Sequence, residues 1–171
     1  ERLRQIWGDP DIPTEPIPPY QLIPPANFTV LLHGFDKWYK LFNSRQLLTI
    51  VKLVKLIREA GKRVEEEKLR EGWSREEAFK YAEAITTYLA IALVRFVDFN
   101  SSVTAWNAGY EIIQHTLAVR GIAMQWNWVE GAPYVSVTGT YIRALRNVIE
   151  GLEYLVNAVS GSPSKVRVLL D

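Results

Sequence analysis

The sequence predicts a mainly α-helical domain of about four helices, with a proline-rich N-terminal arm and one or two short strands. Three observations support this fold class. Apolar residues recur at three- and four-residue steps over several long stretches, as on the buried face of a helix. Ser74 and Glu77 form the capping-box pattern that starts helices. The first 27 residues contain seven prolines, which do not fit a helix.

Residues 1–27 are expected to form an extended arm, because proline lacks an N–H donor and restricts the residue before it. Its apolar side chains favour burial away from water, so the arm either wraps over a partner surface or serves as a linker. These side chains are Ile17, Tyr20, Leu22 and Ile23. Because the sequence starts at Glu1 without a Met, we expect a fragment or a processed product.

Residues 28–171 are expected to form the helical domain. Residues 28–33 are apolar and β-branched, which favours a short strand that ends at Gly34. The first long helix starts at Asn43 or Ser44, both good capping residues, and runs over about 44–60. Gly61 is expected to interrupt or weaken it. Its core face carries Leu47, Ile50, Val54 and Ile57.

The clearest helix spans 75–98, directly after the Ser74 capping box. A shorter helix is predicted over 109–119 and a last one over 140–159, which a Ser-Gly-Ser-Pro sequence ends. Residues 123–129 are rich in aromatic side chains and are expected to be extended. A final strand is predicted over 165–170.

The composition limits the classes of function that the chain can have. The chain has 171 residues and a net charge of +1, so its total charge favours no class of partner. The absence of cysteine excludes disulfides, thiolate zinc sites and cysteine nucleophiles. No apolar run reaches the roughly 18 residues that a membrane span needs. With no recognisable signal peptide, we expect a cytoplasmic protein without a membrane partner.

Motifs for catalysis and cofactor binding are missing from the sequence. It has no phosphate loop, no dinucleotide-binding glycine pattern, no G-x-S-x-G elbow and no pair of histidines at metal-ligand spacing. His115 is expected to be a partly buried structural histidine rather than a catalytic base. We therefore expect no catalytic residue, no cofactor site and no metal site in this chain.

Charge is uneven along the chain. Between Asp36 and Arg58 the sequence has six bases, and Trp38 and Tyr39 lie among them. Cations bind phosphates and aromatic rings stack on bases, so this mixture suits nucleic acid. The alternative is that Trp38 packs with Leu41 and Phe42 ahead of the helix while the lysines are only solvated. The bases are Lys37, Lys40, Arg45, Lys52, Lys55 and Arg58.

Three segments together resemble a family of large bacterial and archaeal adenine-specific DNA methylases, many of which carry a zinc ribbon. Residues 37–48 resemble the family's W-x-x-L-F-x-x-R-Q-L-L segment, and residues 81–102 resemble its next helix. Residues 124–134 resemble its M-x-W-D-F-x-E-x-N-P-F segment. Here the sequence departs from the family, with Asn127 in place of Asp and Ala132 in place of Asn. Any polar contact of that second side chain is therefore in doubt.

The resemblance implies that this chain is the insert between the two halves of a methyltransferase core. The parent would bind S-adenosylmethionine through a motif upstream, and the catalytic Asp-Pro-Pro-Tyr would follow downstream. Neither motif is present here. The expected partners are the remaining methyltransferase core and double-stranded DNA, whose target base must leave the stack before methylation.

The leading hypothesis is thus a DNA-contacting, target-recognition segment of an adenine N6-methyltransferase that is not catalytic by itself. The alternative is a structural or protein-interaction scaffold without a nucleic-acid role, and a small independent enzyme is a third possibility. The predicted DNA-binding residues are Lys37, Trp38, Lys40, Arg45, Gln46, Lys52 and Lys55.

Overall fold

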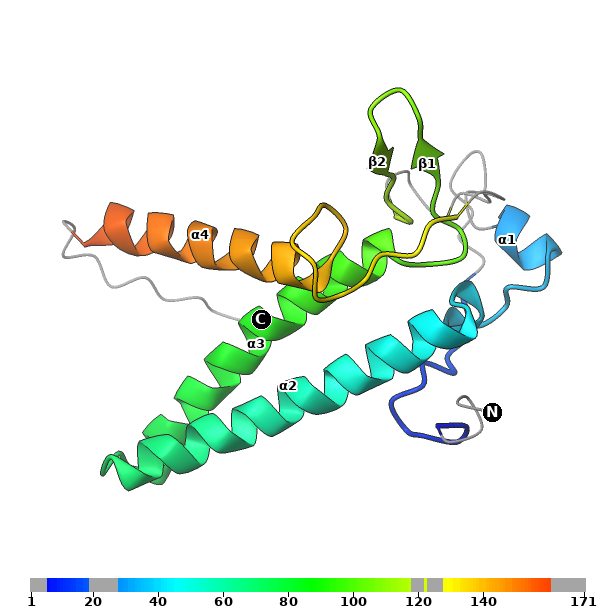
Figure 1. Cartoon of the computed structure of the whole chain (residues 1–171). Coiled ribbons are helices and arrows are strands. Elements are labelled where there is room, and N and C mark those ends of the chain that lie inside the picture. The colour runs from blue at the N-terminus through cyan, green and yellow to red at the C-terminus, as the bar shows by residue number, and fades with distance from the viewer. Residues whose placement is uncertain (1–5, 19–27, 118–121, 123–127, 161–171) are drawn as a thin grey trace.

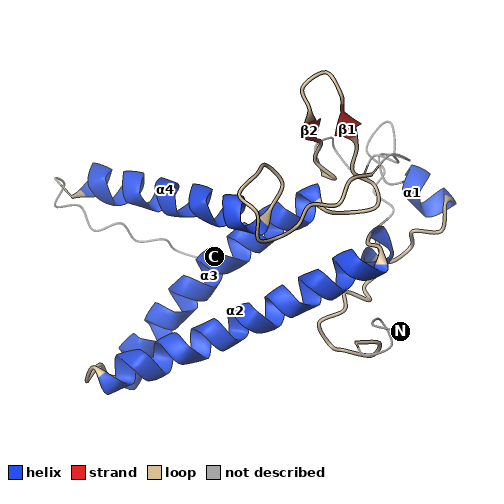
Figure 2. Cartoon of the chain, viewed as in Figure 1, coloured by secondary structure: helices blue, strands red, loops and turns tan. Residues whose placement is uncertain are grey.

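The computed structural model describes residues 6–18, 28–117, 122 and 128–160. It confirms a mainly α-helical fold with a two-stranded antiparallel sheet (Figures 1 and 2). In chain order the elements are α1 (Phe28–Leu32), the 3-10 helix η2 (Trp38–Leu41), α2 (Ser44–Arg70), α3 (Arg75–Phe99), β1 (Trp106–Asn107), β2 (Ile112–Ile113) and α4 (Tyr141–Val159).

The helices α2 and α3 form a long antiparallel hairpin (Figure 1). Both start with the reciprocal hydrogen bonds of a capping box, Asn43 with Gln46 in α2 and Ser74 with Glu77 in α3. These bonds satisfy backbone N–H groups that the first turn leaves without partners. The turn between the helices passes through Gly72, whose φ of +91° favours glycine. Asn43 is thus the N-cap, and the predicted Ser74 box is confirmed.

Gly61 was expected to interrupt or weaken the first long helix, and the interruption is wrong, because α2 continues to Arg70. Gly61 is buried where α2 crosses α3. A Cβ atom at this position would lie 2.5 Å from Cγ2 of Thr86 in α3. The glycine therefore lets the two backbones approach closely, and the packing offsets its weak helix propensity.

Two further elements differ from the sequence prediction. Residues 28–32 form the short helix α1 rather than a strand, since a short apolar run does not distinguish the two by its pattern. The predicted helix over 109–119 is wrong as well: its described part, 109–117, holds a turn and then β2, which pairs with β1 so that Trp106 lies opposite Ile113. The Asn107 side chain accepts bonds from the N–H groups of Gly109 and Tyr110, which favours a turn over a helix.

Two predicted extended segments are largely beyond what the structure describes. Of residues 123–129, only Trp128 and Val129 are described, and they belong to neither a helix nor a strand. The predicted final strand at 165–170 falls outside the described residues.

The described half of the proline-rich arm packs against its own chain. Ile6 and Ile12 are buried with Leu47 and Val51 of α2. Ile17 is buried in a second apolar cluster that includes Val30, Leu41, Val103 and Ile122. Backbone hydrogen bonds reinforce this packing, among them Ile17 N–H to Asp36 O and Tyr39 N–H to Pro13 O. Residues 6–18 are therefore part of the fold, whereas Tyr20, Leu22 and Ile23 lie outside the described residues.

The last helix, α4, meets α3 near the C-terminal end of α3 (Figure 1). Tyr141 packs edge-on against Phe96, with 6.4 Å between the ring centroids, and its hydroxyl donates to the Leu89 carbonyl. Farther along, α4 diverges from α3, and Ala144 is the one buried residue in the helix. Among the described residues, no helix has the length and apolar character that crossing a membrane requires.

The contact at Gly61 predicts opposite effects for the same substitution at two helix positions. Gly61→Ala should lower the free energy of unfolding by about 1–3 kcal/mol, because the added methyl group meets Thr86. Gly151→Ala in α4 meets nothing within 4 Å and should raise it by about 0.4–1 kcal/mol. Chemical denaturation of the two variants measures both effects.

Thr86→Ser provides the control, because it removes the methyl group that clashes and keeps the hydroxyl, which bonds to Ala82 O and Glu83 O. Adding Thr86→Ser to Gly61→Ala should recover much of the lost stability. A Gly61→Ala variant as stable as the parent would contradict the close approach.

Candidate functional site

The predicted DNA-binding residues lie around the N-terminal half of α2, but the structure uses most of their charges internally. Of the six bases between Asp36 and Arg58, four form ion pairs within the chain. The pairs are Lys40 with Asp36, Arg45 with Glu130, Lys55 with Asp9, and Arg58 with Asp11.

Two of these pairs fix the arm to α2. Asp9 and Asp11 lie in the arm, and Lys55 and Arg58 are one turn apart on α2. The hydrogen bond from Lys55 lowers the pKa of Asp9, and likewise Lys40 lowers the pKa of Asp36. The arm therefore carries acidic groups onto the basic face of α2, which reduces the positive charge available to a phosphate.

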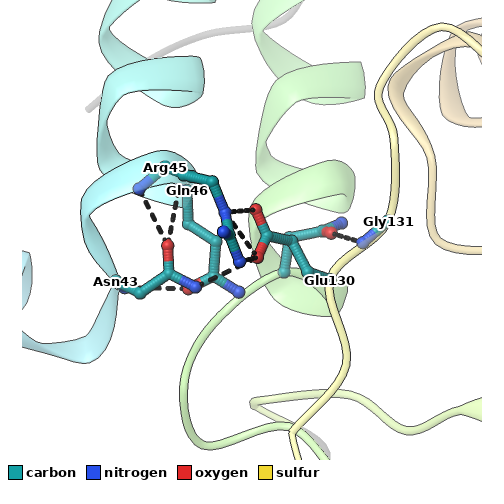
Figure 3. Close-up of polar contacts among 6 residues, drawn as sticks. Asn43, Arg45, Gln46, Glu130 and Gly131 are labelled. Carbon is teal, nitrogen blue, oxygen red and sulfur yellow. Dashed lines mark hydrogen bonds and ion pairs between the residues drawn. The ribbon is translucent and has the colours of Figure 1, made fainter. Parts of the chain in front are cut away.

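Arg45 and Glu130 form the most elaborate polar contact (Figure 3). The guanidinium donates from Nε to Oε1 at 3.1 Å and from Nη2 to Oε2 at 2.8 Å. Asn43, the N-cap of α2, donates from Nδ2 to Oε2 at 3.2 Å. The bonds from Arg45 and then Asn43 hold the pKa of Glu130 below its ordinary value, against the effect of burial. A bidentate pair of this kind fixes direction as well as distance.

The contact continues to the end of α3 through Asn100, which is only 1% exposed. Asn100 accepts from the Gly131 N–H at 2.7 Å and donates to the carbonyls of Gly139 and Phe96 at 2.6 and 2.9 Å. We call this set the polar junction: Asn43, Arg45, Asn100, Glu130, Gly131 and Gly139. It joins the start of α2, the end of α3 and the segment that leads to α4.

Gln46 is buried beside the polar junction, with 3% of its surface exposed. Its Oε1 accepts from the Asn43 N–H at 2.9 Å and completes the capping box. Its Nε2 has no hydrogen-bond partner among the described residues. Gln46 was predicted to contact DNA, and in this structure its side chain faces the interior of the chain instead.

Trp38 lies half-buried in η2 and packs against the apolar cluster of Ile17 and Leu41. This arrangement favours the packing alternative, in which Trp38 and Phe42 cover the core ahead of α2. Its face is therefore partly occupied by the chain itself, which leaves less ring surface for stacking on a base.

Lys37 and Lys52 are the two bases of the stretch that form no ion pair in the part of the chain the structure describes. Lys52 is exposed on α2. Lys37 borders an open hollow of about 350 Å³ whose lining also includes Trp7, Asp9, Thr14 and Tyr39. Trp7 and Tyr39 meet edge-on in this hollow, with centroids 5.8 Å apart.

His115 and Asp98 form a polar pair that sequence reasoning did not find. His115 Nδ1 lies 2.5 Å from Asp98 Oδ2, and the ring packs on Phe99 at a centroid distance of 4.2 Å. Asp98 Oδ1 also accepts from the Leu117 N–H. The pair fastens the segment after β2 to the end of α3, in keeping with the partly buried structural role expected for His115. The residues are 17 positions apart, and no local pattern signals such a contact.

The described residues contain no group of three or more histidine, aspartate or glutamate side chains that could hold a metal ion. Comparison of the sequence with protein-family models gave no match, and searches of curated proteins and of solved structures gave no significant similarity. Any function must therefore be argued from the residues themselves.

The Arg45–Glu130 contact predicts a pH dependence of stability. Because the folded-state pKa of Glu130 lies below its ordinary value of 4.5, its contribution is full above that value and is lost as pH falls through the folded pKa. Glu130→Gln removes the charge at every pH. The difference in Tm between the parent and this variant should be largest near neutral pH and should shrink below about pH 4.5.

Glu150→Gln is the matched control, because Glu150 is exposed on α4 and forms no ion pair among the described residues. Its Tm should follow that of the parent at each pH. A Tm difference for Glu130→Gln that stays constant down to about pH 3 would show that the charge of Glu130 contributes nothing.

Proposed function

We propose that this chain is a helical scaffold that docks another protein on the apolar faces of α3 and α4. The observation that carries the proposal is the exposed stripe on α4, where Leu155, Val156 and Val159 are 58%, 59% and 55% exposed. These residues continue the stripe that Tyr141 begins against α3. A contiguous apolar surface of this kind costs free energy in water and marks interaction sites.

Apolar side chains are also exposed on α3, on a different side of the helix from Leu89 and Phe96, which meet α4. Ile91 and Val94 are 49% and 66% exposed, and Tyr88 is 37% exposed. They recur at three-residue steps along the helix, so they lie near one another on its surface. A single apolar residue on a surface is ordinary, but two neighbouring helices that both expose such residues support a docking role.

The partner that the resemblance proposes is the remaining core of a DNA adenine methyltransferase. That core would also supply the S-adenosylmethionine site, and the whole protein would be cytoplasmic. Arg45 and Glu130 come from two of the segments that carry the resemblance, and they meet in the polar junction. That contact supports treating these segments as one structural unit. It does not by itself favour a particular partner.

DNA contact is the second candidate, and Lys37 and Lys52 are the residues that favour it. They are the bases of the stretch left without an ionic partner among the described residues. Two phosphate contacts supply a weak, salt-dependent affinity. The apolar surface of α3 and α4 has no use in such a contact, so the scaffold proposal accounts for more of the molecule.

Site-specific photo-crosslinking tests the scaffold proposal. A benzophenone amino acid at Leu155 should give protein adducts in cells that express the chain, because this position lies in the exposed stripe. The same group at Glu150, on the charged side of α4, is the matched control and should give few. Equal yields at the two positions, or none at either, would refute the proposal.

The DNA candidate makes a separate prediction that compares free with paired lysines. Changing Lys37 and Lys52 to Ala should lower the slope of log K against log salt by about two units, since each phosphate contact contributes roughly 0.9. Changing Lys40 and Lys55 to Ala removes the same charge from paired positions and should leave the slope unchanged. Fluorescence anisotropy with duplex DNA measures both, and absence of binding at low salt would remove this candidate.

A further inference from the structure

The open hollow beside the arm is lined by two aromatic side chains and a lysine. Its volume is about 350 Å³, which is within the range of small-molecule sites. Trp7 and Tyr39 form one corner of it, and Lys37 and Thr14 line it as well. An aromatic ring and a cation at one hollow are complementary to a ligand that joins a planar ring to an anionic group.

Trp7 lies in a turn whose two ends are fixed. Ile6 and Ile12, on either side of it, are buried against the start of α2. The Asp9 N–H donates to Ile6 O at 2.8 Å, and the Ile12 N–H donates to Asp9 O at 3.0 Å. Trp7 itself is 66% exposed. The turn therefore holds the indole ring in place at the surface, so that binding another ring against it costs little ordering of the chain.

Trp7 rather than Trp38 carries the more open ring in this part of the chain. Trp38, the ring that the sequence indicated for stacking, is half-buried against the core. Trp7 and Tyr39 meet at 88° between their ring planes. Because the rings meet edge-on rather than face to face, their contact covers only one of the four ring faces. The corner thus leaves aromatic surface on which a planar ligand stacks.

Lys37 supplies the positive charge at the hollow. It is partly exposed and forms no ion pair in the part of the chain that the structure describes. Asp9 also lines the hollow, but both of its carboxylate oxygens already have partners. Oδ2 pairs with Lys55, and Oδ1 accepts from the Asp11 N–H at 3.0 Å. The base is therefore available to an anion, while the charge of the acid is already neutralised.

The residue types favour a phosphate as the anionic group. A lysine is a compact point charge that suits a phosphate, whereas a planar carboxylate is matched better by the fork of an arginine. Two aromatic rings at right angles beside a carboxylate also suit a quaternary ammonium group. Here Lys37 repels such a cation, and the carboxylate of Asp9 is paired with Lys55. The charges at the hollow thus select against a cationic ligand.

We propose that this hollow binds a nucleotide, whose base stacks on Trp7 and whose phosphate is bound by Lys37. The base must be unstacked, because a ring inside a duplex has both faces covered by its neighbours. A free nucleotide and a nucleotide within a single strand share this chemistry. The inference is independent of the scaffold proposal, since it uses neither α3 nor α4.

Titration of the isotope-labelled full chain with adenosine monophosphate tests the site by NMR of the tryptophan indole N–H groups. The Trp7 signal is identified by its absence from the spectrum of Trp7→Phe. At constant ionic strength it should shift with a dissociation constant of about 10 mM or less. Trp73 lies at the turn of the α2–α3 hairpin, and its signal is the internal control that should not move. Because the parent chain gives this result, it does not depend on the folding of a variant.

Substitutions separate the stacking contact from the phosphate contact. Trp7→Ala should weaken binding about tenfold, in line with the loss of one stacked base. Lys37→Ala should weaken the binding of adenosine monophosphate but not of adenosine, so that the preference of the parent for the phosphorylated compound disappears. Lys52→Ala is the matched control, because Lys52 is also unpaired among the described residues but does not line the hollow. It should leave both affinities unchanged.

A short single strand of deoxyadenosine distinguishes the two sources of nucleotide. Tighter binding of the strand than of adenosine monophosphate, read at the same Trp7 signal, assigns the site to a strand, and equal or weaker binding assigns it to the free nucleotide. A Trp7 signal that moves with neither probe overturns the inference. So does a parent chain that binds adenosine as tightly as adenosine monophosphate, or a Lys52→Ala variant that loses as much affinity as Lys37→Ala. A larger shift with tetramethylammonium than with the nucleotide would show a cation site instead.

Discussion

The buried carboxamide of Asn100 holds three parts of the chain together. It caps the end of α3, accepts from the Gly131 N–H and donates to the Gly139 carbonyl just before α4. Glu130, the neighbour of Gly131, then binds Arg45 and Asn43 at the start of α2. Asn100 is buried, so losing one of its partners would leave a buried polar group unsatisfied, whereas the Arg45 side chain is 77% exposed and its pair with Glu130 lies at the surface. The directions in which α2, α3 and α4 leave the junction all depend on this arrangement.

This dependence explains how the molecule is built. The apolar clusters gather at one end, where the arm, α1, η2 and the start of α2 meet. The other end is the tip of the α2–α3 hairpin, where α2 and α3 pack on each other and Gly61 allows the close approach. The end of α4 has no support from the described residues beyond its first turns. The buried contacts that stabilise the fold are therefore concentrated near the polar junction. The far ends of the α2–α3 hairpin and of α4 leave most of their side chains exposed.

The long helices could be predicted from the sequence because their signals are local. Capping residues and apolar periodicity act over a few residues, so the sequence predicts the box at Ser74 and a start at Asn43 or Ser44, while the structure shows a second box at Asn43. Gly61 was misjudged because its role depends on Thr86, which is 25 positions away and signals nothing by itself. The hairpin at Trp106–Ile113 was missed because the Asn107 side chain decides the turn against a helical pattern.

The basic stretch at the candidate site shows the same limit, which is that a local sequence pattern does not reveal contacts with distant residues. Counting charges along 36–58 predicts a phosphate surface, but apart from Asp36, which pairs with Lys40, the acids that neutralise it come from other parts of the chain. Asp9 and Asp11 arrive with the arm, and Glu130 arrives across the junction. Only Lys37 and Lys52 of that stretch remain unpaired among the described residues. The described surface is thus less cationic than the sequence indicates and more apolar along α3 and α4. An exposed apolar stripe that continues a buried one favours a protein as its complement, because charge neutralisation contributes nothing to covering it.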